Sequence, residues 1–213
     1  MLIEQMLVGP MAVFSYIVGC EHEKEGLIID PGGSESRILA RAHELGLTIR
    51  YVINTHGHAD HTCGNRKILS ETGAELVVHE ADADEILRGL NRAFTMFMGK
   101  RPSPKAHRLV TDGDLLSVGK TGLNIIHTPG HSPGSICLYG EGNLFTGDTL
   151  FVGAVGRTDL KGGSFETLLD SLRKLFTLAP ETRVWPGHNY GDAAVSTLTR
   201  ERQTNPYITD FLE

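Results

Sequence analysis

The sequence has little of several features that mark particular protein classes. Its 213 residues include three cysteines, Cys20, Cys63 and Cys137, and no two of them form a C-x-x-C pair. So few thiols, odd in number, favour a reducing compartment over a disulfide framework. No apolar run reaches the roughly 20 residues that cross a bilayer, and no Lys or Arg before Lys24 supplies the charged start of a signal peptide. We expect a cytoplasmic protein with no membrane partner.

An excess of basic charge is also missing. The chain carries 20 Lys and Arg against 26 Asp and Glu, a formal net charge of −6. Because phosphate backbones are bound by clustered Lys and Arg, this balance argues against nucleic acid as a partner. Hydrophobic residues make up 40% of the chain and charged residues 22%, which favours a packed core. The length fits one domain over residues 1–213.

Apolar periodicity predicts strands and helices that alternate along both halves of the chain. Strands are expected at 2–8 and 11–19, and helices over 34–46, 62–73, 164–178 and from about residue 192. Residues 80–106 lack a clear period, and they form either a mobile loop with some helix bordering a site or an ordinary surface connection. This order predicts an α/β fold of two packed β-sheets with helices outside.

The stretch HTPGHSPGS (127–135) contains a G-x-S-x-G pattern from Gly130 to Gly134. Such a pattern can mark a nucleophile elbow, which would make Ser132 a catalytic serine. That elbow uses the N–H of the following residue to stabilise an oxyanion, but Pro133 has no N–H. The sequence therefore favours a glycine-proline turn that presents His131, with Ser132 incidental or supporting.

A denser cluster lies in Thr55-His56-Gly57-His58-Ala59-Asp60-His61, directly after an expected strand. Three imidazoles and a carboxylate are costly to bury without a bound cation. Alternating His56 and His58 can face one ion, with Asp60 and His61 offset toward a second one. Imidazole and carboxylate ligands suit Zn, Fe or Mn.

One loop cannot fill two coordination spheres, so the cluster requires partners from elsewhere in the chain. The candidates are His131, Asp148 in FTGDT and His188 in PGHNY. Each follows a short apolar strand beside a glycine, and we expect these residues to converge at one sheet edge.

THGHADH, TPGHSPGS, FTGDT and PGHNY, in this order, resemble the ligand motifs of the metallo-β-lactamase superfamily over about residues 10–190. The resemblance implies an αββα four-layer sandwich, with two mixed β-sheets packed face to face and helices outside. It implies two divalent ions, Zn first, with Fe or Mn as alternatives. His56, His58 and His131 would bind one ion and Asp60, His61 and His188 the other, while Asp148 bridges. Asp60 and Asp148 would also be the catalytic carboxylates.

The stretch FVGAVGRTDLKGG and the tail ERQTNPYI resemble the small glyoxalase II-like branch. This branch implies a metallohydrolase in which hydroxide bound by two metals cleaves a small acyl compound, foremost a thioester of the hydroxyacylglutathione type. The chain ends soon after His188, without the helical extension that binds glutathione in glyoxalase II, so the thiol stays open. Zinc, thioesterase activity and a homodimer are further expectations of the resemblance.

Other members of the superfamily leave alternatives open. Persulfide dioxygenases share the GRTD stretch and use a single iron. A lactonase or another hydrolase of the superfamily, a tRNA-processing nuclease and a non-enzymatic metal-binding module also fit parts of the pattern. The acidic balance of the chain disfavours the nuclease.

Three residues other than the proposed ligands are candidates for supporting roles. Arg157 would hold a substrate anion, or else pair with Asp159. Tyr190 would line the substrate pocket. Asp30 would orient a ligand histidine, or else serve only the turn before Pro31.

Overall fold

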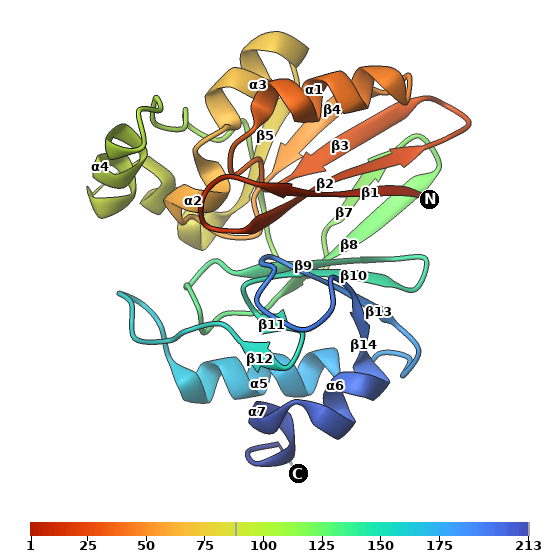
Figure 1. Cartoon of the computed structure of the whole chain (residues 1–213), viewed down its shortest axis with the longest axis vertical. Helices are drawn as coiled ribbons and strands as arrows, with labels where there is room; N and C mark the ends of the chain where they lie inside the picture. Colours follow the sequence, from red (N-terminus) through yellow and green to blue (C-terminus); the bar gives the residue numbers. More distant parts are fainter. Residues whose placement is uncertain (88, 213) are drawn as a thin grey trace.

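Two six-stranded sheets form the centre of the molecule, and Figure 1 shows them stacked face to face with helices on both outer sides. The structure is a computed structural model that describes residues 1–87 and 89–212. The sheets contain both parallel and antiparallel neighbours. This arrangement confirms the expected αββα sandwich of two mixed sheets.

The first sheet has the order β1-β2-β3-β4-β5-β6. Its strands are β1 (Leu2–Val8), β2 (Val13–Cys20), β3 (Glu25–Ile29), β4 (Thr48–Ile53), β5 (Glu75–His79) and β6 (Arg108–Val110). The pairs β1·β2 and β2·β3 are antiparallel, and β3 to β6 run parallel. Parallel strands end at the same edge of a sheet, so the segments that follow β3 and β4 emerge side by side.

The second sheet has the order β14-β13-β10-β9-β8-β7. Its strands are β7 (Leu115–Val118), β8 (Thr121–His127), β9 (Ile136–Gly140), β10 (Asn143–Gly147), β13 (Arg183–Pro186) and β14 (Ser196–Thr197). A short ribbon, β11 (Leu150–Phe151) with β12 (Ala154–Val155), lies after β10. The parallel pair β10·β13 brings the ends of two distant segments together.

Alternation along β2 shows how the layers are specified. All eight residues of this strand are buried, because both of its faces are covered. Val13 and Ile17 pack on the helix side, whereas Phe14, Tyr16 and Val18 pack between the two sheets. A strand with period two therefore contributes to two cores at once.

Helices cover the outer face of each sheet (Figure 1). The helices of the described residues are α1 (Glu35–Glu44), α2 (Ala59–Thr62), α3 (Asn65–Thr72), α4 (Gly89–Phe97), α5 (Phe165–Leu175), α6 (Leu198–Thr204) and α7 (Pro206–Thr209), with 3₁₀ turns η1 (Glu80–Asp82) and η2 (Glu85–Leu87). Figure 1 shows α4 at the side of the sandwich. In α5, Leu168, Leu172 and Leu175 are fully buried, as the periodicity predicted. Within the described ranges, no helix is long and apolar enough to cross a membrane.

Two expected helices differ from the observed ones. The helix predicted over 62–73 is interrupted at Gly64, whose N–H donates to the Pro31 carbonyl at 2.9 Å. The helix predicted from about residue 192 begins only at Leu198, where the Thr197 hydroxyl accepts from the Arg200 N–H. Residues 196–197 instead pair with β13, and this tertiary contact overrides the local helical pattern.

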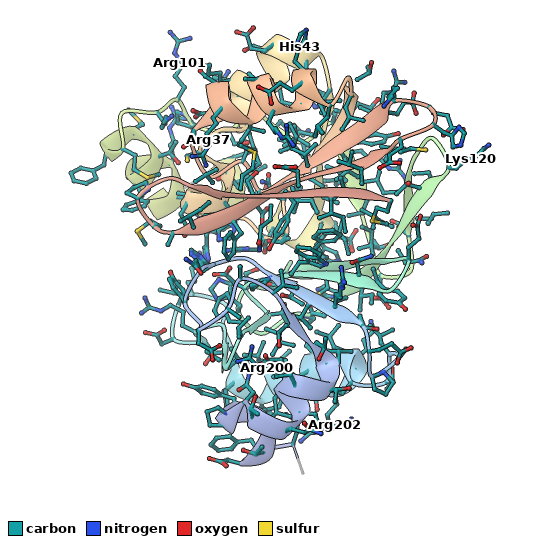
Figure 2. All side chains as sticks on the ribbon, turned by 45° about the vertical axis from the view of Figure 1, so that its right-hand side comes forward. Arg37, His43, Arg101, Lys120, Arg200 and Arg202 are labelled. Carbon is teal, nitrogen blue, oxygen red and sulfur yellow. The ribbon has the colours of Figure 1, made fainter. Side chains whose placement is uncertain are left out.

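Several of the arginines labelled in Figure 2 lie at opposite ends of the molecule. Arg101 lies at the end that carries α1, and Arg200 and Arg202 lie at the opposite end, among the helices of the second sheet. The absence of a nucleic-acid partner stays a prediction.

Candidate metal centre

Loops from both sheets meet at one edge of the sandwich. The 54–58 segment follows β4, α2 carries Asp60 and His61, and the 128–135 loop connects β8 to β9. Asp148 follows β10 and His188 follows β13. The structure thus brings together all seven residues that the sequence proposed as ligands.

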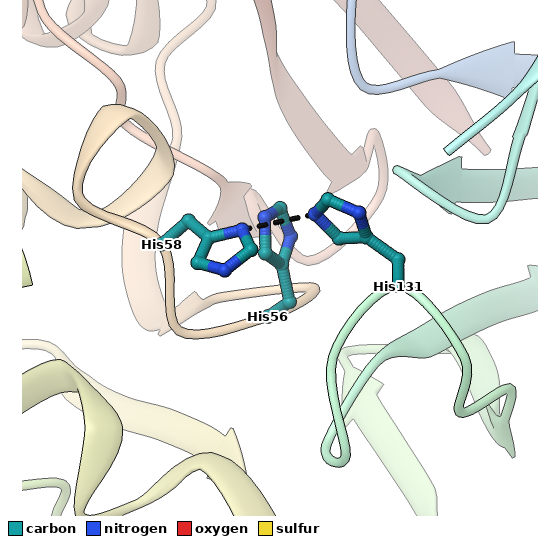
Figure 3. A group of neighbouring side chains, drawn as sticks. All are labelled: His56, His58 and His131. Carbon is teal, nitrogen blue, oxygen red and sulfur yellow. Dashed lines mark hydrogen bonds between the residues drawn. The ribbon is translucent and has the colours of Figure 1, made fainter. Parts of the chain in front are cut away.

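The first group consists of His56, His58 and His131, whose donor nitrogens lie within 4.8 Å of one another. Figure 3 shows the three rings converging from two separate loops. His58 Nδ1 lies 2.9 Å from His131 Nε2, as the dashed line marks. At most one of two ring nitrogens so close together carries a proton, and the other presents a lone pair.

The second group consists of Asp60, His61 and His188, whose donor atoms also lie within 4.8 Å of one another. His61 Nε2 is 3.0 Å from His188 Nε2, and Asp60 Oδ2 is 3.5 Å from His188 Nε2. Two nitrogens and one carboxylate oxygen provide half of an octahedral or most of a tetrahedral coordination sphere.

Asp148 lies between the two groups. Its carboxylate oxygens are 3.3 Å from the Nε2 atoms of His61 and His188, and Oδ2 is 3.6 Å from His131 Nε2. One carboxylate that contacts histidines of both groups has the position of a bridging ligand. The His and Asp residues are therefore positioned for a dinuclear metal site.

The donor atoms themselves indicate that a cation belongs here. His56 Nε2 and Asp148 Oδ1 are buried and receive no hydrogen bond, although His61 Nε2 lies 3.3 Å from Asp148 Oδ1. Buried polar atoms without a partner are rare in native proteins and call for an explanation such as a bound ion. Imidazole and carboxylate ligands suit Zn, Fe and Mn alike, so the donor set fits a metal without naming it.

A buried carboxylate, Asp30, orients histidines of both groups. Asp30 Oδ2 accepts from His61 Nδ1 at 2.9 Å and from the Thr55 hydroxyl at 2.6 Å. The Thr55 oxygen in turn lies 3.1 Å from His56 Nδ1, and the Thr55 N–H donates to Asp30 Oδ1 at 2.8 Å. Asp30 thus has the supporting position expected of it, and the Nε2 atoms of His56 and His61 point inward.

Backbone carbonyls orient two further ligand histidines. His131 Nδ1 donates to the Arg157 carbonyl at 2.8 Å, and His188 Nδ1 donates to the Met11 carbonyl at 2.9 Å. These bonds leave the Nε2 atoms free to bind an ion. His58 differs, because its Nδ1 faces the site.

The electrostatics of the site vary sharply between its histidines. Burial, reinforced by the neighbouring His131, lowers the pKa of His58 to about 4. Burial opposes the charged form of His61 as well, but the carboxylates of Asp148, Asp60 and Asp30 outweigh it and raise its pKa to about 10. The site without metal therefore holds a proton on the side of the second group.

Asp82 is a positioning residue that the sequence did not reveal. Its carboxylate is almost fully buried and accepts from the N–H groups of Gly57 at 2.8 Å and Gly134 at 2.7 Å. The Ser132 hydroxyl donates to it at 2.7 Å. Asp82 thus ties the loop of His56 and His58 to the loop of His131. Its only local signal is its place at the end of η1, three residues after β5.

The same contacts define the role of Ser132. This side chain is buried and bonds Asp82 and the Ser135 hydroxyl, which lies 2.8 Å away. A hydroxyl so engaged supports the turn and is not directed at a substrate. Ser132 thus belongs to the support of the His131 loop, in keeping with the argument from Pro133.

A cavity of about 840 Å³ opens over the metal centre and is lined by His58, His131 and Asp148. Arg157 and Tyr190 also line it. The Arg157 guanidinium forms two hydrogen bonds to Asp159, at 2.7 and 2.6 Å, so the expected ion pair is present. Its contact with a substrate anion stays a prediction. Tyr190 stacks on His188 with ring centroids 4.5 Å apart. Part of α4 forms a wall, which places segment 80–106 at the border of the site.

Comparison with known proteins agrees with this geometry. Residues 8–188 match the metallo-beta-lactamase superfamily. The chain is 32% identical over 212 residues to the mitochondrial persulfide dioxygenase ETHE1 of Bos taurus, covering 98% of this chain and 76% of that protein. It is 37% identical over 179 residues to hydroxyacylglutathione hydrolase of Rhodospirillum rubrum, covering 83% of this chain and 62% of that protein.

Solved structures of similar chains share the fold. The crystal structure of the BLEG-1 B3 metallo-beta-lactamase has a TM-score of 0.88 at 30% identity and covers 98% of this chain and 100% of that one. The structure of TTHA1623 in a di-iron-bound form has a TM-score of 0.83 at 31% identity, covering 96% of this chain and 99% of that one. These likenesses confirm the resemblance that the motifs predicted.

Proposed function

We propose that this chain, which belongs to the metallo-beta-lactamase superfamily, is a metal-dependent hydrolase of acyl compounds, with a thioester as its foremost substrate. The observation that carries the proposal is the pair of three-donor groups on either side of Asp148. A site with donors for two ions suits hydrolysis, because one centre can activate water while the other polarises the carbonyl.

Each residue of the site has a defined task in this proposal. His56, His58 and His131 would hold one ion, Asp60, His61 and His188 the other, and Asp148 would contact both. When bound, the two ions supply Lewis acidity and lower the pKa of a shared water. Asp60 and Asp148 place two negative charges beside the cations and so reduce their mutual repulsion.

Residues of the cavity would bind the substrate. Burial, with the charges of Asp148 and Asp60, raises the pKa of Tyr190, so its hydroxyl stays protonated and can donate a hydrogen bond. Arg157 can exchange Asp159 for a substrate carboxylate, since both are exposed and the pair is solvated. A thiolate leaves readily, so thioester cleavage requires no strong general acid.

Metal content and substrate turnover test the proposal together. The protein is purified, analysed for Zn, Fe and Mn, and assayed on hydroxyacylglutathione thioesters, a lactone and a phosphodiester. We expect two ions per chain and thioester cleavage. His58→Ala is expected to lose one ion and most of the activity. Full activity after chelation, or in His58→Ala with both ions retained, contradicts the proposal.

A second candidate function, persulfide dioxygenase activity, is favoured by the similarity to ETHE1 over nearly the whole chain. Such an enzyme consumes oxygen and forms sulfite from a persulfide. One iron per chain, with oxygen uptake and sulfite but no thioester cleavage, would favour this function over hydrolysis. One preparation of the protein can be assayed for both activities.

A further inference from the structure

The cavity above the metal centre has an unusually apolar wall. Five of the eleven large apolar side chains that are exposed among the described residues line this one cavity. They are Met11, Phe94, Phe97, Leu160 and Tyr190. Exposed apolar side chains gathered at one place mark a site that binds an apolar partner.

Helix α4 contributes the most exposed part of this wall. Phe97 is 87% exposed and Phe94 40% exposed, and their rings stack with centroids 6.4 Å apart. Phe94 and Phe97 are three residues apart and so lie on one side of the helix. Most of the Phe97 ring is thus uncovered, although an aromatic ring of this size is usually buried.

The wall is held in place relative to the metal centre. Asn91, in the first half of α4, accepts from the Ala59 N–H at 3.2 Å, directly beside the ligand Asp60. The Asn91 amide also donates to Glu85 at 3.0 Å. Helix α4 is therefore tied to the segment that carries Asp60, and its Phe94 and Phe97 line the same cavity as the metal ligands.

The remaining lining of the cavity combines apolar and cationic groups. Phe151 and Val155 belong to it, with Arg157 and Lys161. The volume of about 840 Å³ is within the range of small-molecule sites, about 300 to 1,000 Å³. A concave cavity that reaches the metal ligands suits a small molecule better than a second protein copy, which would require a broader flat surface.

We propose that the substrate of this site has an apolar acyl group, aliphatic or aromatic, that packs against Phe94 and Phe97 while its carbonyl lies at the metal centre. This proposal rests on the proposed hydrolase function and defines its substrate class. In the reaction, water adds to the acyl carbon, the bond from carbon to sulfur or oxygen breaks, and the leaving thiol or alcohol takes the proton.

A series of thioesters with one common thiol tests the proposal. The metal-loaded protein is assayed on N-acetylcysteamine thioesters from acetyl to octanoyl. Because each buried methylene is worth about 0.8 kcal/mol, or about 4-fold, we expect kcat/KM to rise by about 2- to 4-fold per methylene. Phe97→Ala should flatten this dependence, with a loss in kcat/KM that grows from the acetyl to the octanoyl thioester.

Phe211→Ala is the matched control, since Phe211 is 52% exposed and does not line the cavity. Binding of butyrate and octanoate to the metal-free protein gives a readout apart from turnover. Wild type and Phe211→Ala should bind octanoate more tightly than butyrate, and Phe97→Ala should bind the two alike.

The outcomes separate this proposal from the hydrolase function itself. If no acyl compound is cleaved, the hydrolase function fails. If cleavage occurs but kcat/KM is independent of acyl chain length, the apolar acyl proposal is overturned while the hydrolase function stands. The same holds if Phe211→Ala reduces the dependence on chain length as much as Phe97→Ala does. A dimer that dissociates in Phe97→Ala, with no dependence on chain length, would assign the wall to a second copy and overturn the proposal.

Discussion

Replacing Asp82 by alanine tests whether the two loops that carry the first histidine group depend on one buried carboxylate. In the native protein this carboxylate accepts the N–H groups of Gly57 and Gly134 and the Ser132 hydroxyl. Alanine provides no acceptor. A Cβ atom added at Gly134 would lie only 2.6 Å from the Cβ atom of Asp82. The loop therefore packs tightly against this residue and has little room to rearrange.

The magnitude follows from the hydrogen bonds that are lost. Two buried N–H groups lose their acceptor, and each such orphan costs about 1 to 3 kcal/mol. Ser132 keeps the Ser135 hydroxyl as a partner and adds little. Asp82→Ala should therefore lower the free energy of unfolding by about 2 to 6 kcal/mol. Asp82→Asn keeps one carbonyl acceptor and should lose about half as much.

Urea unfolding of the metal-free protein measures this loss, and titration with Zn measures the effect on the site. Because Asp82 positions His56, His58 and His131 indirectly, we expect the affinity of the first group to fall by about 10- to 100-fold. The Zn affinity of the second group should fall less. In Asp82→Asn, the Zn affinity of the first group should be higher than in Asp82→Ala. An unequal loss of Zn affinity in the two groups distinguishes a positioning role of Asp82 from a general loss of stability.

Glu201 provides a matched control. It is also fully buried, and it accepts from the Gly153 N–H at 2.8 Å, the Asn205 amide at 2.9 Å and the Ser196 hydroxyl. Glu201→Ala should destabilise the protein without selective loss of one metal. An unchanged unfolding free energy in Asp82→Ala, or the same selective metal loss in Glu201→Ala, would refute the reasoning.

Four further predictions concern the nucleophile, the metal, the pH dependence and the core. Ser132→Ala should keep thioester turnover within a few-fold and lose about 1 kcal/mol of stability; a loss comparable to that in His131→Ala would revive a serine mechanism. Chelation should abolish turnover and Zn should restore it, as measured by activity and metal analysis. In the metal-free protein, the His61 pKa of about 10 lies above its unfolded value of about 6.5, so its stabilising contribution is full below pH 6.5 and is lost as the pH rises toward 10. Metal must displace that proton, so affinity should rise over the same interval, and calorimetry in buffers of different ionisation enthalpy should detect the release; a pH-independent affinity would contradict this. Leu172→Ala, at a fully buried position of α5, should cost about 2 to 5 kcal/mol in thermal or urea unfolding, and a change below 1 kcal/mol would show that α5 packs differently.

Much of the fold was predictable because the apolar pattern of each element matches its burial. The leucines of α5 recur at helical spacing and lie in one core cluster, and β2 alternates between two cores. The start of the last helix was not predictable. Residues 196–197 join β13 through a contact with a distant segment, and local spacing contains no sign of it.

The ligand set was accessible to sequence reasoning for a different reason. His56, His58, Asp60 and His61 are neighbours in the chain, and their density has few explanations other than a cation. The roles of Asp82 and of the aromatic wall on α4 were not accessible. Asp82 lies 50 residues from the serine that it bonds, and no local pattern links the two.

Residue order alone was sufficient for the family, the sandwich and the candidate ligands, because these depend on periodicity and on short motifs. Other features depend on segments that lie far apart in the chain. They are the ring nitrogen that faces the site, the position of Asp148 between the two groups, and the side chains that line the cavity. Chain folding brings these atoms within a few ångströms, and only at such distances do charge, hydrogen bonding and burial act on one another.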